Sequence, residues 1–134
     1  MECQVSNRAL HVLIVDDDIV TRFLLTEFCR TLNHVPTAVP NGKSCLEKIC
    51  DPAFVCDLIF MDMHLKGETG IDIARNIRAL ENQGRSTVPI VALTADPDFA
   101  LSGIPHLFCE ILSKPCSLTQ IDGYLRLHAT NTIR

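Results

Sequence analysis

Short, continuous apolar runs alternate along the chain with segments in which apolar residues recur every three or four positions. Three runs rich in Val, Ile and Leu span His11–Val15, Asp57–Met61 and Val88–Leu93. Such runs are typical of strands that are buried on both faces of a parallel sheet. Two weaker runs, Val35–Val39 and Phe108–Leu112, predict two more strands, the first of them at an edge.

Helical periodicity fills the intervals between these runs. In the first interval Val20, Leu24 and Phe28 recur at four-residue spacing, and Phe23 and Leu32 widen the same stripe. Three further helices are marked by Leu46 and Ile49, by Ile73, Ile77 and Leu80, and by Leu118, Ile121 and Leu125 with Ser117 as the N-cap.

Strand and helix alternate five times with short connections, which predicts an α/β fold with a parallel sheet and helices on both faces. The interval between Thr94 and Lys114 is short and contains Pro97, Gly103 and Pro105. Because proline and glycine interrupt helices, the fourth helix is expected to be abbreviated or irregular.

The composition, with 134 residues of which 47% are hydrophobic and 21% charged, fits one globular domain. We expect a single domain over residues 1–134, with a core at about 10–128 and loose ends at 1–9 and 129–134. The net charge of −4, without a Lys/Arg run, argues against direct binding of nucleic acid. The apolar runs are too short to span a membrane, and no secretory signal is visible, so a cytoplasmic protein is expected.

The cysteines favour neither a disulfide framework nor a zinc site, because their number, seven, is odd and their spacing is scattered. Cys45 and Cys50 are the closest pair, and a separation of five residues is poor geometry for shared ligation on a helix. We interpret the cysteines as small apolar residues in a reducing compartment.

Polar side chains follow the predicted strands at their carboxyl ends. They are Asp16, Asp17 and Asp18 after the first strand, Asp62 after the third, Thr94-Ala95 after the fourth and Ser113-Lys114-Pro115 after the fifth. Ligands of open parallel sheets bind beyond these ends, where the strand order reverses. Acids, a hydroxyl and a lysine are therefore expected on one rim.

The charges on this rim suggest a chemistry. Asp17 and Asp62 would repel each other unless a divalent cation lies between them, and oxygen-only ligands suit Mg²⁺. With the cation in place, Asp62 can attack phosphorus and form an aspartyl phosphate. Lys114 then fits the role of a point charge, and Thr94 that of a hydrogen-bond donor, toward the phosphoryl oxygens.

In these motifs the chain resembles the receiver (response regulator) domain of two-component and phosphorelay signalling, from the first strand through the last helix. The motifs are the acidic pair Asp16-Asp17, Asp62 with Gly70 eight residues later, Thr94-Ala95, and Lys114-Pro115. Together, in this order, they are far more specific than any one alone. The resemblance implies a flavodoxin-like, doubly wound (βα)5 domain whose five-stranded parallel sheet has the order 2-1-3-4-5.

The resemblance also implies a role for each rim residue. Asp62 receives the phosphoryl group, Asp17 binds Mg²⁺ directly and Asp16 more indirectly, the backbone carbonyl of His64 adds a metal ligand, and Thr94 and Lys114 contact the phosphoryl oxygens. The implied donor is a sensor histidine kinase or a histidine phosphotransfer protein. The domain would be a phosphoacceptor rather than a turnover enzyme, with no membrane contact of its own and with a weak dimer left open.

Two positions depart from the family pattern. Lys66 stands where the family usually has proline, and Gly67 and Gly70 are expected to let the loop keep its course. Ile111 stands where the family usually has the Tyr or Phe that swings inward on activation.

Other polar residues are expected to have ordinary structural roles. Asp18 is interpreted as a helix cap, the side chains of His34, His64, His106 and His128 as surface groups, and Tyr124 as a residue that packs along the last helix.

Two alternative functions stay open at this point. A phosphohydrolase of the haloacid-dehalogenase type would need an acid two residues after Asp62, where this chain has His64, and room for a cap domain. A phosphorylation-independent pseudo-receiver is favoured only by the altered switch position. The chain is either a free-standing receiver or part of a hybrid kinase or larger regulator, and the stretch Pro89–Ala95 (PIVALTA) is typical of hybrid-kinase receivers.

Overall fold

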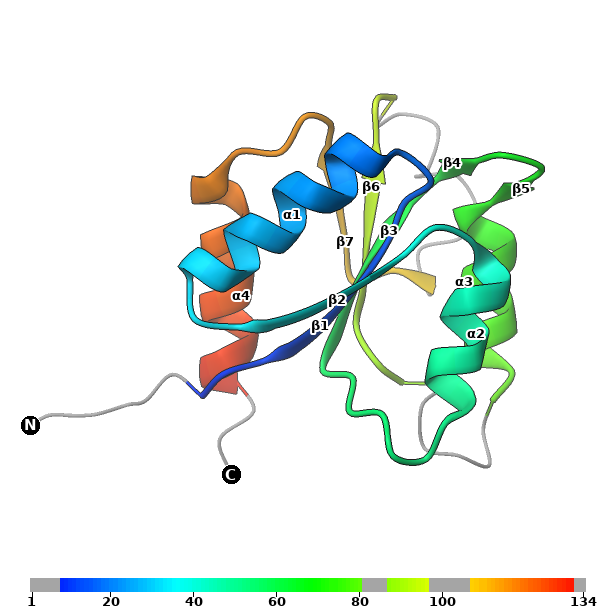
Figure 1. The fold of residues 1–134 in the computed structure, drawn as a ribbon, viewed down its shortest axis with the longest axis horizontal. Coiled ribbons are helices and arrows are strands. Elements are labelled where there is room, and N and C mark those ends of the chain that lie inside the picture. Colours follow the sequence, from blue (N-terminus) through cyan, green and yellow to red (C-terminus); the bar gives the residue numbers. More distant parts are fainter. Residues whose placement is uncertain (1–7, 81–86, 97–106, 132–134) are drawn as a thin grey trace, which may run out of the picture.

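A five-stranded parallel sheet forms the centre of the computed structural model, which describes residues 8–80, 87–96 and 107–131. Its strands are β1 (His11–Val15), β2 (Val35–Val39), β3 (Leu58–Asp62), β6 (Ile90–Thr94) and β7 (Glu110–Ser113). Their order, β2-β1-β3-β6-β7, is the predicted 2-1-3-4-5 arrangement, with β2 at an edge as expected (Figure 1). A separate two-stranded hairpin, β4 (His64–Leu65) with β5 (Glu68–Thr69), follows β3.

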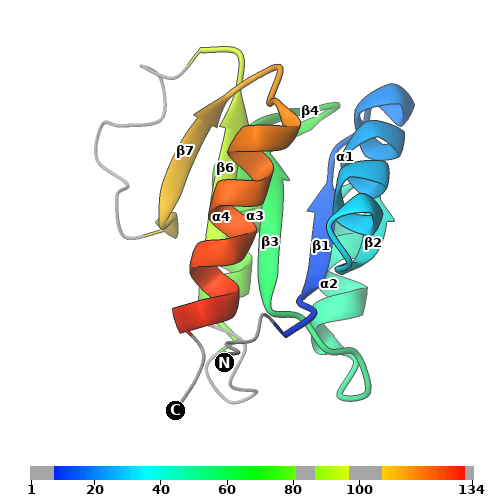
Figure 2. The same cartoon turned by 90° about the vertical axis from the view of Figure 1, so that its left-hand side faces the viewer.

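Helices lie on both faces of the sheet. They are α1 (Ile19–Thr31), α2 (Gly42–Cys50), α3 (Gly70–Arg78) and α4 (Leu118–Asn131). Helices α1 and α4 cover one face, and α2 and α3 cover the other (Figure 1, Figure 2). The helix predicted between β6 and β7 falls largely on residues 97–106, which lie outside the described residues. The predicted surface residue His106 is one of them. None of the helices among the described residues has the length and apolar character that crossing a bilayer requires.

Alternation along the strands fills the two layers. In β1, Leu13 and Val15 pack with α2 and α3, whereas Val12 and Ile14 pack with α1 and α4. Every residue of β3 and β6 is buried, as continuous apolar runs predict for strands covered on both sides. The predicted limits of β3 were one residue early, because Asp57 instead accepts the backbone N–H of His11 at 2.8 Å and ties off the start of the strand.

The apolar stripe that indicated α1 in the sequence is only partly turned toward the sheet. Leu25 and Cys29 form its buried side. Of the stripe residues, Phe28 and Leu32 pack against the core. The other three, Val20, Phe23 and Leu24, are 65%, 64% and 43% exposed. Two apolar stripes lie side by side on this helix, and spacing alone does not tell which one faces the sheet.

No disulfide involves the six cysteines in the described part of the chain. Cys29 and Cys45 are buried in opposite layers, where burial raises the pKa of each thiol to about 12. These two fit the interpretation as apolar filler, whereas Cys50 and Cys109 are exposed.

Gly70 allows α3 to begin directly against the end of β3. A Cβ atom at this position would lie 2.4 Å from the backbone oxygen of Asp62 and 3.0 Å from the side chains of Met61 and Met63. The N–H of Gly70 donates to the Met63 carbonyl at 3.1 Å, which fixes the close approach. The glycine eight residues after Asp62 is therefore a packing requirement of this fold.

We predict that Gly70→Ala destabilises the protein by about 1–3 kcal/mol, because the new methyl group collides with backbone that has no room to move. Gly123→Ala is the matched control, since a Cβ there meets nothing within 4 Å and alanine favours the helix over glycine. Urea unfolding measures both free energies. Equal stabilities of the two variants would contradict the packing explanation.

Candidate functional site

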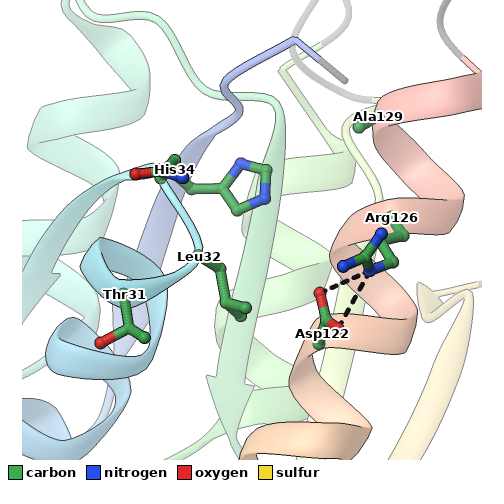
Figure 3. A pocket seen from close by; sticks show the side chains of 7 residues that line it. Thr31, Leu32, His34, Asp122, Arg126 and Ala129 are labelled. Atoms are coloured by element: carbon green, nitrogen blue, oxygen red, sulfur yellow. Dashed lines mark hydrogen bonds and ion pairs between the residues drawn. The ribbon is translucent and has the colours of Figure 1, made fainter. Parts of the chain in front are cut away.

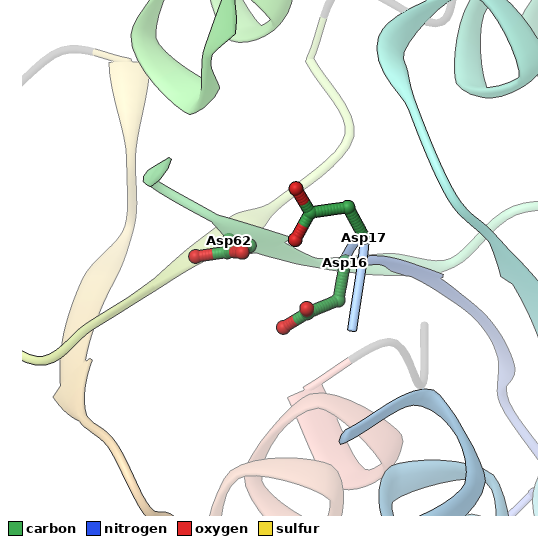
Figure 4. A group of neighbouring side chains, drawn as sticks. All are labelled: Asp16, Asp17 and Asp62. Atoms are coloured by element: carbon green, nitrogen blue, oxygen red, sulfur yellow. The ribbon is translucent and has the colours of Figure 1, made fainter. Parts of the chain in front are cut away.

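Three carboxylates meet where β1 and β3 end side by side. Asp16 and Asp17 follow β1, Asp62 is the last residue of β3, and their carboxylate oxygens lie within 4.8 Å of one another (Figure 4). Asp16 is 1% exposed and Asp62 4% exposed. Because β1 connects to β2 on one side and pairs with β3 on the other, this cluster lies at the point where the strand order reverses.

Lys114 brings a positive charge to the cluster from the end of β7. Its Nζ lies 2.9 Å from Asp16 Oδ2 and 3.4 Å from Asp62 Oδ1. Burial opposes the charge of this lysine, but the hydrogen bond and charge of Asp16, together with Asp62, outweigh burial and raise the pKa of Lys114. The sequence prediction that Lys114 and the acids share one rim is therefore correct in geometry.

Asp62 is the carboxylate that burial affects most clearly. Burial raises its pKa, and the negative charge of Asp16 adds to this, while the His64 N–H at 3.1 Å and Lys114 act in the opposite direction. Among the described residues, Lys114 is the ammonium that contacts this group of three carboxylates, so the cluster favours an additional cation.

Asp17 is held from the other side by the hairpin after β3. Its Oδ2 accepts the backbone N–H of Lys66 at 2.7 Å. Lys66 and Gly67 form the two-residue turn between β4 and β5, and Gly67 has φ 75°, a conformation that glycine adopts readily. The sequence predicted a relaxed loop here and gave no indication of paired strands.

The donor set fits magnesium, because each candidate ligand atom is an oxygen. Among the hydrogen bonds of the described residues, Asp17 uses Oδ2 and Asp62 uses Oδ1, so the second oxygen of each can bind a metal ion. Both oxygens of Asp16 are engaged, Oδ1 with the Asp18 N–H and Oδ2 with Lys114.

Thr94 reaches the same rim at the end of β6 and is fully buried. Its hydroxyl accepts the Asp96 N–H at 3.0 Å and lies 3.2 Å from the Asp96 carbonyl, to which it donates. The Thr94 carbonyl accepts the backbone N–H of Lys114 at 2.9 Å, which links the ends of β6 and β7. Ile111, at the predicted switch position, is partly buried against Met63 and Ala92.

The predicted helix caps are confirmed. Asp18 Oδ2 accepts the Thr21 hydroxyl at 2.7 Å and the Thr21 N–H at 3.0 Å, and these bonds lower the pKa of Asp18. Ser117 Oγ accepts the Gln120 N–H at 3.1 Å, and Gln120 Oε1 accepts the Ser117 N–H at 3.0 Å, which forms a capping box.

The prediction for the His64 side chain is confirmed, and those for His34, His128 and Tyr124 need correction. His64 has an exposed side chain, as expected. His34 and His128 are partly buried rather than fully exposed, and burial lowers the pKa of both. Tyr124 does more than pack along α4, because its hydroxyl donates to the carboxylate of Glu110 on β7, and burial together with this bond raises its pKa.

A hollow of about 510 Å³ lies at the opposite end of the sheet, between the end of α1 and α4 (Figure 3). Its charged groups and its histidine have structural partners: Arg126 Nε donates to both oxygens of Asp122 at 2.9 and 3.0 Å, and His34 Nδ1 accepts the Leu10 N–H at 2.9 Å. The carboxylate rim is therefore the stronger candidate for chemistry.

Known proteins are similar to this chain in sequence and in fold. The model of the response regulator receiver domain family matches residues 12–126. The autoinducer 2 sensor kinase/phosphatase LuxQ of Vibrio vulnificus is 38% identical over 93 residues, which cover 69% of this chain and 10% of LuxQ. Sensor protein GacS of Pseudomonas syringae is 35% identical over 91 residues, which cover 67% of this chain and 10% of GacS. The matched region thus spans about a tenth of each relative.

Among solved structures, the receiver domain of sensor histidine kinase PA1611 from Pseudomonas aeruginosa matches with a TM-score of 0.73 and 28% identity over 91% of this chain and 98% of that one. That crystal structure holds a magnesium ion coordinated in the active-site cleft. A receiver domain from Methylobacillus flagellatus shares the fold with a TM-score of 0.80 at 21% identity, over 90% of this chain and 99% of that one. With the sheet order, the rim and the family match in agreement, this chain belongs to the response regulator receiver domain family.

Proposed function

We propose that this chain is a working phosphoacceptor: Asp62 takes a phosphoryl group from a phospho-histidine donor, with Mg²⁺ bound by the acidic rim. The observation that carries this proposal is the buried carboxylate of Asp62, 3.4 Å from Lys114 and clustered with Asp16 and Asp17. The magnesium ion in the receiver of PA1611 supports the choice of metal.

Each residue of the rim has a task in the proposed transfer. One carboxylate oxygen of Asp62 attacks the phosphorus, the phosphorus–nitrogen bond to the donor histidine breaks, and the ring nitrogen keeps the electron pair. Lys114 moves from Asp16 toward a phosphoryl oxygen. The Thr94 hydroxyl stops donating to the Asp96 carbonyl and donates to a second phosphoryl oxygen instead. Asp17, Asp62 and the carbonyl of His64 would hold magnesium, which supplies positive charge for the carboxylates and the transferred group.

The alternatives are weaker. The pseudo-receiver is disfavoured because Asp17, Asp62 and Lys114 are all present and lie on one rim. The phosphohydrolase alternative is disfavoured by the family match and by His64, which stands in the place of the second acid and exposes its side chain. We further propose that this is a phosphoacceptor rather than a turnover enzyme. A single domain over residues 1–134, a cytoplasmic location and a weak dimer stay predictions.

The outer face of α1 offers a docking surface for the donor. Ile19, Val20, Phe23 and Leu24 form this apolar surface and are 69%, 65%, 64% and 43% exposed. It begins at the N-terminus of α1, which follows the acidic pair after β1 and the N-cap Asp18, so a protein bound to it lies beside the rim (Figure 1). Solvent-exposed apolar clusters of this kind mark protein interaction sites.

A cavity extends this surface toward the phosphoacceptor. It has a volume of about 290 Å³ and is lined by Thr21, Leu24, Leu25, Lys114, Pro115 and Cys116. Lys114 contacts Asp62, so an apolar side chain inserted here would lie close to the reacting groups. We propose that a sensor histidine kinase or a histidine phosphotransfer protein docks on this surface, as the sensor proteins among the relatives suggest.

Asp62 should be the site of phosphorylation, with a strict need for Mg²⁺. After incubation with acetyl phosphate, reduction with borohydride and mass mapping should place the adduct on Asp62 in the wild type. Asp62→Asn and EDTA should each abolish labelling, while Asp72→Asn, which changes an exposed acid on α3, should leave it unchanged. Labelling that survives Asp62→Asn would overturn the assignment.

The apo protein should be less stable because of its crowded acids, and Mg²⁺ should reverse this. Since the folded state raises the pKa of Asp62, the native state holds its proton more tightly, and stability is lost as the pH rises through the raised value. In EDTA, Asp62→Asn should therefore be more stable than the wild type at pH 7.5, and the difference should shrink toward pH 4.

The metal side of this prediction uses thermal unfolding of the wild type, Asp17→Asn and Asp72→Asn. Mg²⁺ at a hundred times its Kd should stabilise the wild type by about 2.7 kcal/mol, because it binds only the native state. Asp17→Asn should weaken this response and Asp72→Asn should not. If millimolar Mg²⁺ leaves the melting temperature of the wild type unchanged, the protein has no formed metal site.

Phe23→Ala should slow phosphotransfer from a histidine-phosphorylated phosphotransfer protein by about tenfold in kcat/KM, since a central aromatic contact is worth that much binding energy. Labelling by acetyl phosphate, which needs no docking, should be unaffected. Val55→Ser, at an exposed apolar residue elsewhere, is the control. Equal loss with both donors would show that the variant damages the rim rather than the docking surface.

A further inference from the structure

The hairpin of β4 and β5 is placed between the acidic rim and α2. His64 pairs with Thr69 and Leu65 with Glu68, so the turn at Lys66 and Gly67 is fixed by two short antiparallel strands. This hairpin follows Asp62 directly and ends at Gly70, the first residue of α3. Its course is thus determined at both ends.

Two hydrogen bonds tie the hairpin to distant parts of the chain. At the turn, the Lys66 N–H donates to Asp17 Oδ2 at 2.7 Å, 49 residues away in sequence. On the second strand, Glu68 Oε2 accepts the N–H of Gly42 at 2.9 Å, at the start of α2. Both are bonds between a carboxylate and a backbone N–H, and such charge-assisted bonds are short and strong.

We propose that this hairpin is a positioning device for the metal ligand Asp17, in which the Lys66 N–H holds the carboxylate and Glu68 holds the hairpin against α2. The inference rests on the proposed function, because Asp17 is a metal ligand only there. It adds two positioning groups, the peptide N–H of residue 66 and the carboxylate of Glu68.

Electrostatics explains why Asp17 needs such a device. Asp16 and Asp62 repel the Asp17 carboxylate, and Lys114, which contacts the other two, is not paired with Asp17 among the described residues. The Asp17 side chain is only partly buried, so rotation toward water would relieve the repulsion. A bond from the Lys66 N–H to Oδ2 opposes that rotation and keeps Oδ1 available for the metal ion.

The residue type at position 66 decides whether this bond exists. Proline, which the family usually has at this position, lacks the N–H and could not donate to Asp17. The departure to Lys66 therefore supplies a donor that the usual residue cannot. The lysine side chain is exposed, so the backbone N–H is the group that matters.

The variants Lys66→Pro and Lys66→Ala distinguish the contribution of the backbone N–H to Mg²⁺ binding from that of the lysine side chain. Lys66→Pro removes the N–H and should raise the Kd for Mg²⁺, measured by calorimetric titration, by about tenfold, the low end for loss of a group that orients a metal ligand. Lys66→Ala keeps the N–H and should bind Mg²⁺ like the wild type. Equal affinities of the two variants, or tighter binding by Lys66→Pro, would overturn the proposal.

Glu68 tests the second anchor. Glu68→Ala loses the acceptor for the Gly42 N–H and should weaken Mg²⁺ binding severalfold, less than Lys66→Pro because it acts through the hairpin. Glu68→Gln keeps an oxygen acceptor and should restore most of the affinity. Glu47→Ala, at an exposed acid on α2, controls for the loss of one negative charge. If Glu68→Gln and Glu47→Ala weaken binding as much as Glu68→Ala, charge rather than positioning is responsible and the proposal is wrong.

Stability and labelling keep the outcomes distinct. Unfolding free energies in EDTA are measured for every variant, and a loss of stability with an unchanged Kd contradicts a positioning role. A wild type that is labelled on Asp62, with Lys66→Pro and Lys66→Ala alike in Kd, overturns this inference and leaves the proposed function standing. A wild type that binds no Mg²⁺ overturns both.

Discussion

The ammonium group of Lys114 lies between two buried carboxylates, and the arrangement of the rim depends on this contact. Asp16 and Asp62 are almost completely buried, so each carboxylate needs a nearby positive charge or a proton. Lys114 contacts both, at 2.9 and 3.4 Å, although it lies 98 residues after Asp16 in the sequence. In the described part of the chain, Lys114 is the cation that forms ion pairs with these acids, so the three carboxylates exceed the positive charge that contacts them, which favours binding of a metal ion.

The fold delivers these charges through its order of strands. Parallel strands end at one edge, and the reversal between β1 and β3 lets Asp16 and Asp62 approach each other without intervening backbone. The segments around the rim hold its members by backbone bonds: Lys66 donates to Asp17, and Lys114 donates to the Thr94 carbonyl. The site is therefore positioned by regular structure and its immediate continuations.

Much of this could be predicted from the sequence, because the relevant signals are local. The buried strands β1, β3 and β6 are continuous apolar runs, and the rim residues stand at the end of each run or directly after it. The apolar spacing in α1 indicated a helix but not its buried side, because spacing gives period but not phase. Phe28 and Leu32 pack against the core, whereas Val20 and Phe23 are exposed. The hairpin was missed because two-residue strands have no periodicity. The dipeptide Lys66-Gly67 was the one local indication of a turn.

A crystal structure of the protein with Mg²⁺ and beryllofluoride tests the account of the rim most directly. The account predicts beryllium bonded to a carboxylate oxygen of Asp62 and a metal ion in contact with Asp17. It also predicts that Lys114 Nζ moves from Asp16 to a fluorine atom. A complex in which beryllofluoride binds elsewhere, or in which Lys114 keeps its 2.9 Å contact with Asp16 while the anion is bound, would contradict it.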